Sequence, residues 1–94
     1  MKTDPRLRSL LPKYLENRKK DLRELREALC MDNFELIKNI SHSIRGHAAS
    51  YGFESLTEIC KKIEQATPEK NHQLIKSLLD EYDEYVSSVE LPGR

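Results

Sequence analysis

Apolar residues recur every three or four positions along four stretches of this chain, and no stretch alternates apolar with polar residues over the length of a strand. The first pattern is typical of amphipathic helices, whereas alternation is typical of half-buried strands. The 94 residues are therefore predicted to form an all-α fold, an antiparallel up-and-down four-helix bundle. We expect core helices over residues 13–30, 33–51, 53–66 and 68–90 within a single domain spanning residues 1–94.

The first two helix starts are predicted from residues that favour helix ends. Asp4-Pro5 is typical of a helix start. Pro12, inside the first stretch, predicts a kink or a break that leaves a short N-terminal lead-in helix. Asp32, followed by Glu35 three residues later, matches a capping box with Asp32 at the N-cap of the second helix.

Three further signals complete the predicted boundaries. Gly52 predicts the end of the second helix, Thr67-Pro68 the start of the last one, and Pro92-Gly93 its end. The apolar stripes of the four helices are the candidate core: Leu11, Leu15, Leu22, Leu25, Leu29, Phe34, Ile37, Ile40, Ile44, Ala48, Phe53, Leu56, Ile59, Cys60, Ile63, Ala66, Leu74, Ile75, Leu78, Leu79, Tyr82, Val86 and Val89.

Composition excludes several classes of protein. Sixteen basic and sixteen acidic residues cancel, which argues against a dedicated nucleic-acid binder. No apolar run reaches the ~18 residues of a membrane span and no signal peptide follows Met1, so we expect a cytoplasmic protein that does not bind membranes. Cys30 and Cys60 lack metal-ligand spacing, and we expect two buried or half-buried thiols, with a disulfide as the alternative. Without a Gly-rich phosphate loop the chain shows no ATP site, so it is not a complete kinase.

Charge is distributed unevenly along the chain. Residues 1–30 carry nine basic and five acidic side chains, a net charge of +4, and residues 68–90 carry two basic and six acidic ones, a net charge of −4. We expect the first and last helices to attract each other across the bundle. A role in steering a partner is the alternative.

The second helix carries a histidine where folding does not require one. On a helical wheel of ~100° per residue, its apolar residues fall within an arc of ~120°, and His42 falls almost opposite that arc. His42 is therefore predicted to point outward, with Gly46 one turn and Ala49 two turns later on the same side. Glycine inside a helix costs ~1 kcal/mol relative to alanine. Bare backbone beside His42 would let another protein approach the imidazole closely.

Two cations flank the same ring: Lys38 lies one turn before His42 and Arg45 three residues after it. A cationic pair around an exposed imidazole favours an arriving anion such as a phosphoryl group. The pattern therefore predicts a phosphoryl acceptor. Taken separately, a surface histidine is usually just a polar residue, and Gly46 could serve close helix packing. Those alternatives do not explain why the features gather on one outer face.

The segment around His42 resembles the histidine-containing phosphotransfer (HPt) domain family of multistep two-component phosphorelays. The family has a histidine followed two residues later by an aliphatic residue, three later by a basic residue and four later by glycine, with small residues and a second glycine beyond. Those positions are held here by His42, Ile44, Arg45, Gly46, Ala48, Ala49 and Gly52. The stripe of the third helix also matches, so the resemblance spans nearly the whole chain.

The resemblance implies a phosphorelay intermediate rather than an enzyme. It implies that His42 accepts a phosphoryl group on Nε2 from a receiver-domain aspartate, or from a kinase, and passes it to another response-regulator receiver domain. Arg45 and Lys38 would stabilise the phosphoryl group, and Gly46, Ala49 and Glu35 would face the receiver. The expected partners are receiver domains or a hybrid histidine kinase. We expect a monomer without a cofactor of its own, with Mg²⁺ supplied by the receiver.

Two positions depart from the family pattern. Arg45 replaces the more common lysine, which keeps the charge but changes its geometry. His47 stands where a small or polar residue is usual, and its place at the edge of the apolar arc predicts a structural or interfacial role. His72 is predicted to be a surface residue. The alternatives are a helical adaptor that docks a receiver or another partner without being phosphorylated, and a dimerisation helix pair of a histidine kinase. Ser43 argues against the second, because such kinases have an acidic residue there.

Overall fold

Four α-helices make up nearly all of the described chain. The computed structural model describes the backbone of residues 5–89 and the side chains of residues 12–89. The helices are α1 (Pro5–Cys30), α2 (Phe34–Ala48), α3 (Glu54–Ala66) and α4 (His72–Ser88), with one 3₁₀ turn, η1 (Ala49–Tyr51), after α2. Within residues 5–89 there is no strand, so the predicted all-α class is confirmed.

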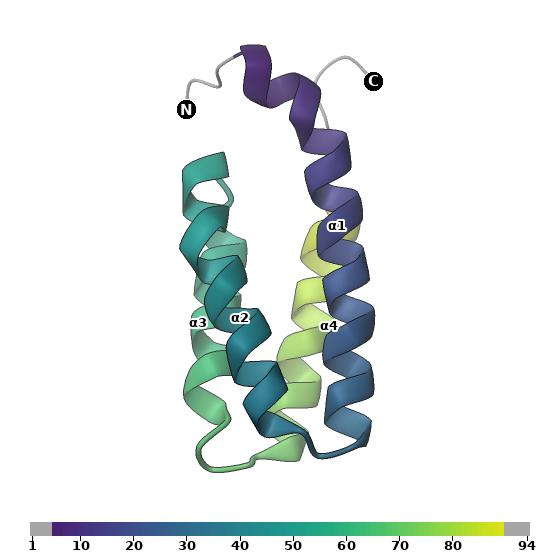
Figure 1. The fold of residues 1–94 in the computed structure, drawn as a ribbon, viewed down its shortest axis with the longest axis vertical. Coiled ribbons are helices and arrows are strands. Elements are labelled where there is room, and N and C mark those ends of the chain that lie inside the picture. Colours follow the sequence, from purple (N-terminus) through teal and green to yellow (C-terminus); the bar gives the residue numbers. More distant parts are fainter. Residues whose placement is uncertain (1–4, 90–94) are drawn as a thin grey trace.

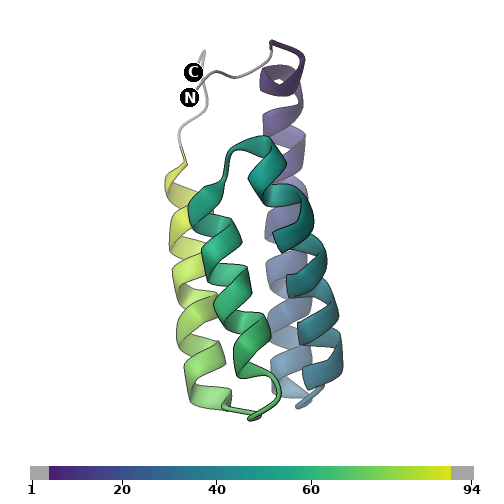
Figure 2. The same ribbon diagram turned by 90° about the vertical axis from the view of Figure 1, so that its left-hand side faces the viewer.

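The helices run alternately up and down, as Figures 1 and 2 show. Each helix packs against two others, because α2 and α3, α3 and α4, α4 and α1, and α1 and α2 are all in contact. Connections of a few residues permit only antiparallel neighbours. The predicted antiparallel bundle is therefore confirmed, and the α1–α2 and α3–α4 connections lie together at the lower end in Figure 1. Across residues 5–89, each helix is either too short or too polar to cross a bilayer.

The predicted lead-in helix is not a separate element. α1 begins at Pro5 and continues through Pro12 to Cys30; Asp4, its predicted N-cap, lies outside the described residues. Pro12 lacks the N–H that would bond the carbonyl four residues earlier, a loss that bends a helix without always ending it. Figure 1 shows the first turns of α1 leaning away from the axis of the rest. Of the two predicted outcomes, the bend is the one observed.

The predicted start of α2 at Asp32 is wrong by one residue. Asn33 is the N-cap, and its side-chain oxygen accepts a hydrogen bond from the backbone N–H of Leu36 at 3.2 Å. Asp32 instead adopts a left-handed backbone conformation, with φ of 55°. Both residue types favour caps, and the tight turn after α1 decides between them. At the other end, Gly52 has φ of 87° and closes η1, as predicted.

The predicted start of α4 at Thr67-Pro68 is also wrong. Thr67 is the C-cap of α3, and its hydroxyl donates a hydrogen bond to the Glu64 carbonyl at 2.8 Å. A turn over residues 67–70 follows, with Lys70 left-handed at φ of 52°. Asn71 then caps α4 by accepting from the N–H of Leu74 at 3.1 Å. The predicted end at Pro92-Gly93 lies outside the described residues; α4 ends at Ser88.

The predicted stripes meet in one core. Most of their members are buried; Phe34, Ile40 and Val89 are half-buried, and Leu74 is 44% exposed. The side chain of Leu11 lies outside the described residues.

Cys60 is buried, whereas Cys30 is exposed, which corrects the expectation of two buried or half-buried thiols; neither forms a disulfide. Cys30 ends α1, one position past the buried Leu29, so its side chain turns to solvent. Burial raises the pKa of the Cys60 thiol to about 12.

The opposite charges of the first and last helices meet at one cluster. A guanidinium nitrogen of Arg26 in α1 lies 3.1 Å from a carboxylate oxygen of Asp80 and 3.6 Å from one of Asp83, both in α4. The attraction predicted between these helices therefore has a structural counterpart. Because all three side chains are at least a third exposed, each pair contributes at most ~1 kcal/mol to stability.

Candidate functional site

The buried face of α2 determines where His42 points. Ile37, Ile44 and Ala48 are fully buried and set the rotation of the helix about its axis. Ser41 is also fully buried, and its hydroxyl donates to the Ile37 carbonyl, so its polar group is satisfied within the helix. His42, the next residue, has a side chain 64% exposed. The outward orientation predicted from the wheel is confirmed.

A carboxylate on the neighbouring helix holds the ring of His42. Nδ1 of His42 lies 3.0 Å from Oε2 of Glu64 in α3. An ionised carboxylate can only accept a hydrogen bond, so the proton of this bond belongs to Nδ1. The neutral ring then carries no proton on Nε2, whose lone pair is free to act as a nucleophile. Glu64 also orients the imidazole, because its own side chain is only 18% exposed.

Sequence reasoning missed Glu64. It lies 22 residues from His42, on a different helix. The only signal for it was its place beside Ile63 at the edge of the buried stripe of α3. That place indicates a half-buried carboxylate facing a neighbouring helix, but it does not say which one.

Arg45 completes a group of three with His42 and Glu64. A terminal nitrogen of Arg45 lies 3.5 Å from Nδ1 of His42, and its Nε lies 3.5 Å from Oε1 of Glu64. Oε1 is buried and has no hydrogen-bond partner among the described residues, so the guanidinium balances its charge as an ion pair. Arg45 thus lies at the Nδ1 side of the ring, where it supports the carboxylate.

Gly46 and Ala49 leave the surface beside His42 bare. A Cβ atom added to Gly46 would meet no atom of the described residues within 4 Å. Close packing of helices therefore does not explain this glycine, and that alternative is ruled out. Ala49, in η1, is exposed on the same side. A surface of small residues next to an exposed imidazole is open to the approach of another protein.

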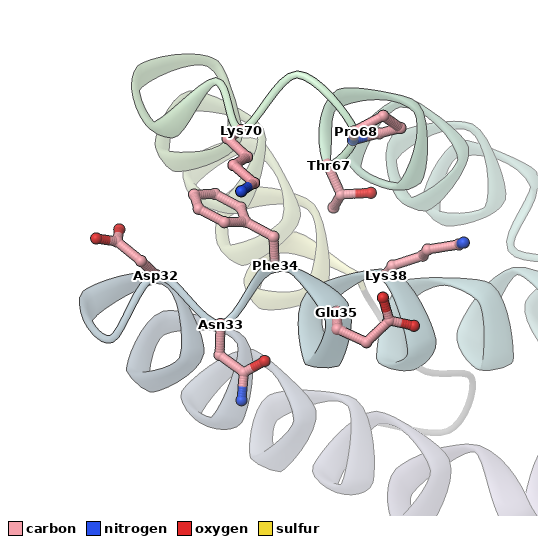
Figure 3. A pocket seen from close by; sticks show the side chains of 8 residues that line it. All are labelled: Asp32, Asn33, Phe34, Glu35, Lys38, Thr67, Pro68 and Lys70. Atoms are coloured by element: carbon pink, nitrogen blue, oxygen red, sulfur yellow. The ribbon is translucent and has the colours of Figure 1, made fainter.

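Lys38 and Glu35 lie toward the end of the bundle. Both are exposed, one and two turns before His42, and both line a groove between the start of α2 and the α3–α4 turn. Figure 3 shows the Lys38 side chain extending along α2 beside Thr67 and Pro68. The structure thus gathers Arg45 and Glu64 at the ring, and it places Lys38 and Glu35 at this groove, one and two turns away from His42.

His47 belongs to a separate cluster between α1 and α2. Its Nδ1 lies 2.9 Å from the hydroxyl of Tyr14, and the two rings meet edge to face. Burial, and then the charge of Arg18, lower the pKa of His47. Tyr14 also stacks on Tyr51 and Phe53. His47 therefore has the structural role predicted for it, and His72, the first residue of α4, is exposed as predicted.

The fold and this site define a class of protein: a helical bundle that carries an oriented, exposed imidazole on its surface. The comparison with protein families identifies the class. The family model described as Hpt domain matches residues 9–90, and the chain belongs to this family. A search of curated proteins and a search of solved structures each returned no match. Hpt domains carry phosphoryl groups in phosphorelays, are not kinases, and interact with receiver domains and kinases.

Proposed function

We propose that this protein accepts a phosphoryl group on Nε2 of His42 from a receiver-domain aspartate, or from a kinase, and passes it to a second receiver. One observation carries the proposal: the exposed ring of His42 bonds Glu64 through Nδ1 at 3.0 Å. Because that bond occupies Nδ1, Nε2 is left as the nucleophilic atom of a side chain that is 64% exposed and accessible to a partner. A surface histidine without such a carboxylate would have neither a preferred tautomer nor a fixed ring.

The transfer needs little equipment from this chain. The Nε2 lone pair attacks the phosphorus of the acyl phosphate, an N–P bond forms, and the P–O bond to the aspartate breaks, which returns a carboxylate to the receiver. The Nδ1 proton stays in its bond to Glu64, whose negative charge stabilises the positive charge that develops on the ring. Phosphoryl transfer depends mainly on positioning and charge stabilisation. The reverse sequence passes the group on.

Three further roles belong to the same proposal. Arg45 keeps Glu64 in place and supplies positive charge near the phosphoryl group, and Lys38 adds a second cation one turn away. Gly46, Ala49 and Glu35 lie on the surface that meets the receiver. The receiver brings Mg²⁺ and the aspartate carboxylate that gives or takes the phosphoryl group, so this chain contributes the imidazole ring and the residues around it.

A labelling experiment tests the proposal. The protein is incubated with a ³²P-labelled receiver and Mg²⁺, and separately with labelled phosphoramidate, a small donor that needs no docking. We expect label that is stable to alkali and labile to acid on the wild type and none on His42→Gln. Nitrogen-edited ³¹P NMR should place the phosphorus on Nε2. His47→Gln is the matched control, because it removes a second histidine of α2 and should keep the label.

The alternative of an unphosphorylated adaptor makes the opposite prediction. An adaptor would bind receivers and show no label on His42 from either donor. Label that persisted in His42→Gln would place the acceptor elsewhere, and label on Nδ1 would contradict the role given to Glu64.

A further inference from the structure

A groove of about 430 Å³ lies where the two connections at the lower end of the bundle come together. Phe34 and Lys38 of α2 line one side, and Pro68 and Lys70 of the α3–α4 turn line the other. Figure 3 shows the Phe34 ring pointing from α2 toward that turn, while the Asp32 side chain points away from it. The groove therefore has an apolar base with two lysines at its rim, and the acidic side chain of Glu35 also lines it next to the Lys38 side.

The groove continues the surface that carries His42. Lys38 precedes His42 by one helical turn, and Thr67, which also lines the groove and caps the end of α3, follows Glu64 by three residues. Both walls are thus extensions of the helix faces that hold the His42–Glu64 bond. At 1.5 Å per residue, Lys38 lies ~6 Å and Phe34 ~12 Å from His42 along the axis of α2.

A docked receiver is large enough to cover both places. A typical protein–protein interface buries ~800 Å² on each partner, which corresponds to a round patch of ~16 Å radius. A receiver centred on His42 with that footprint reaches the groove. The face nearest His42 offers it little apolar surface, since Gly46 and Ala49 are small and exposed. Phe34, half-buried against the core, is an apolar group within that footprint that a partner side chain can contact.

We propose that this groove is a second docking point for the receiver, and that it takes an apolar side chain flanked by a carboxylate. The apolar side chain would lie on Phe34 and Pro68, and the carboxylate would pair with the ammonium of Lys70 or Lys38. Receivers that lack this combination would dock less well, so the groove selects among receivers. The inference rests on the proposed function, because it assumes that a receiver approaches His42.

Lys70→Glu tests the groove without touching the site around His42. Lys62→Glu is the matched control: it makes the same charge change at an exposed position of α3 that lines a different hollow, beside Leu74 and Leu78. Lys70→Asn is a second groove variant, which removes the charge and suits the left-handed backbone at φ of 52°. Circular dichroism checks that each variant is folded.

The measurement is the initial rate of His42 labelling against the concentration of a receiver charged with ³²P-acetyl phosphate, using the receiver that labels the wild type fastest. Each rate is divided by the rate with phosphoramidate for the same variant. We expect KM for the receiver to rise about five- to tenfold in Lys70→Glu and less in Lys70→Asn, with kcat within about twofold. The KM of Lys62→Glu should stay within about twofold of the wild type.

Two results would overturn the inference. Equal KM values for Lys70→Glu and Lys62→Glu would show that the groove lies outside the interface, and a fall in kcat alone would show that it acts on the transfer step and not on docking. If neither the labelled receiver nor phosphoramidate labels His42 in the wild type, the proposed function itself is wrong and the inference falls with it. If phosphoramidate labels His42 normally and the receiver kinetics of Lys70→Glu are unchanged, the docking role of the groove is wrong and the proposed function stands.

Discussion

The carboxylate of Glu64 in α3 reaches Nδ1 of His42 in α2 at 3.0 Å, and so holds an exposed imidazole in one orientation. Among the described residues this is the relationship from which the chemistry of the site follows. It assigns the proton to one ring nitrogen and frees the other. Because Arg45 contacts both partners, the three side chains should respond to substitution as one unit.

Replacing Glu64 should slow phosphorylation of His42 in a graded manner. Glu64→Gln keeps an acceptor for Nδ1 but loses the negative charge, and Glu64→Ala loses both. We expect roughly tenfold and up to about 100-fold lower rates with phosphoramidate, by analogy with the loss when the hydrogen-bond partner of a metal-binding histidine is removed. The control is Glu58→Gln, which changes an exposed carboxylate on the same helix to a carboxamide. Equal rates for the wild type and Glu64→Ala would contradict the role of the carboxylate.

Arg45→Ala should lower the rate of transfer from a receiver or shorten the lifetime of phosphohistidine, by about fivefold. The reason is the loss of positive charge beside the ring and of the ion pair to Glu64 at 3.5 Å. Residues in contact have non-additive effects, so the double variant with Glu64→Ala should be less impaired than the product of the two single effects. Arg26→Ala, which breaks an ion pair on the α1–α4 side, should leave transfer unchanged. If the effects of Arg45→Ala and Glu64→Ala on the transfer rate were fully additive, Arg45 would act independently of Glu64.

Gly46→Ala should stabilise the protein while a larger residue impairs docking. Within the part of the chain that the structure describes, a Cβ at this position meets nothing within 4 Å, and alanine in a helix interior is favoured by up to ~1 kcal/mol over glycine. That gain corresponds to a rise of roughly 4–8 °C in Tm for a domain of this size. Gly46→Gln should keep the helicity of the wild type and raise KM for the receiver. Loss of the fold in either variant would show that Gly46 serves packing.

Tyr14→Phe should cost about 1 kcal/mol of unfolding free energy, because it removes the hydroxyl that bonds Nδ1 of His47 while keeping the stacked ring. Denaturant unfolding measures the loss. The control is the same substitution in a His47→Phe background, where the hydrogen bond is already absent and Tyr14→Phe should cost little. An unchanged cost in that background would mean that the hydroxyl stabilises the protein through another contact.

His47 should make stability depend on pH. Its pKa is lowered in the folded state by burial and by Arg18, so between that value and its ordinary value near 6.5 the unfolded chain binds more protons. Its contribution to stability is therefore fully present above pH ~6.5 and is lost as the pH falls through the folded-state pKa. Denaturant unfolding at several pH values should show a flatter profile for His47→Gln than for the wild type. A wild-type profile in His47→Gln would refute the assignment.

The helix content and the outward position of His42 could be predicted from the sequence because both follow from local periodicity. Leucine and isoleucine at three- and four-residue spacing specify which face of each helix is buried, and a residue opposite that face must point to solvent. The same reasoning placed His47 at the edge of the core. No partner helix has to be known for these predictions.

Helix boundaries and the contacts between helices depended on the tertiary structure. Asp32 and Asn33 are nearly equivalent N-caps by residue type, as are Thr67 and Asn71. In each pair the second residue is the N-cap, because the path of the preceding tight turn places it at the helix start. Glu64 could not be assigned to His42 from sequence, because spacing along the chain does not say which faces of two helices meet. The packing of α2 against α3 determines that Glu64 pairs with His42. The sequence by itself determined an exposed histidine, and only the packed bundle placed the carboxylate that makes it a directed nucleophile.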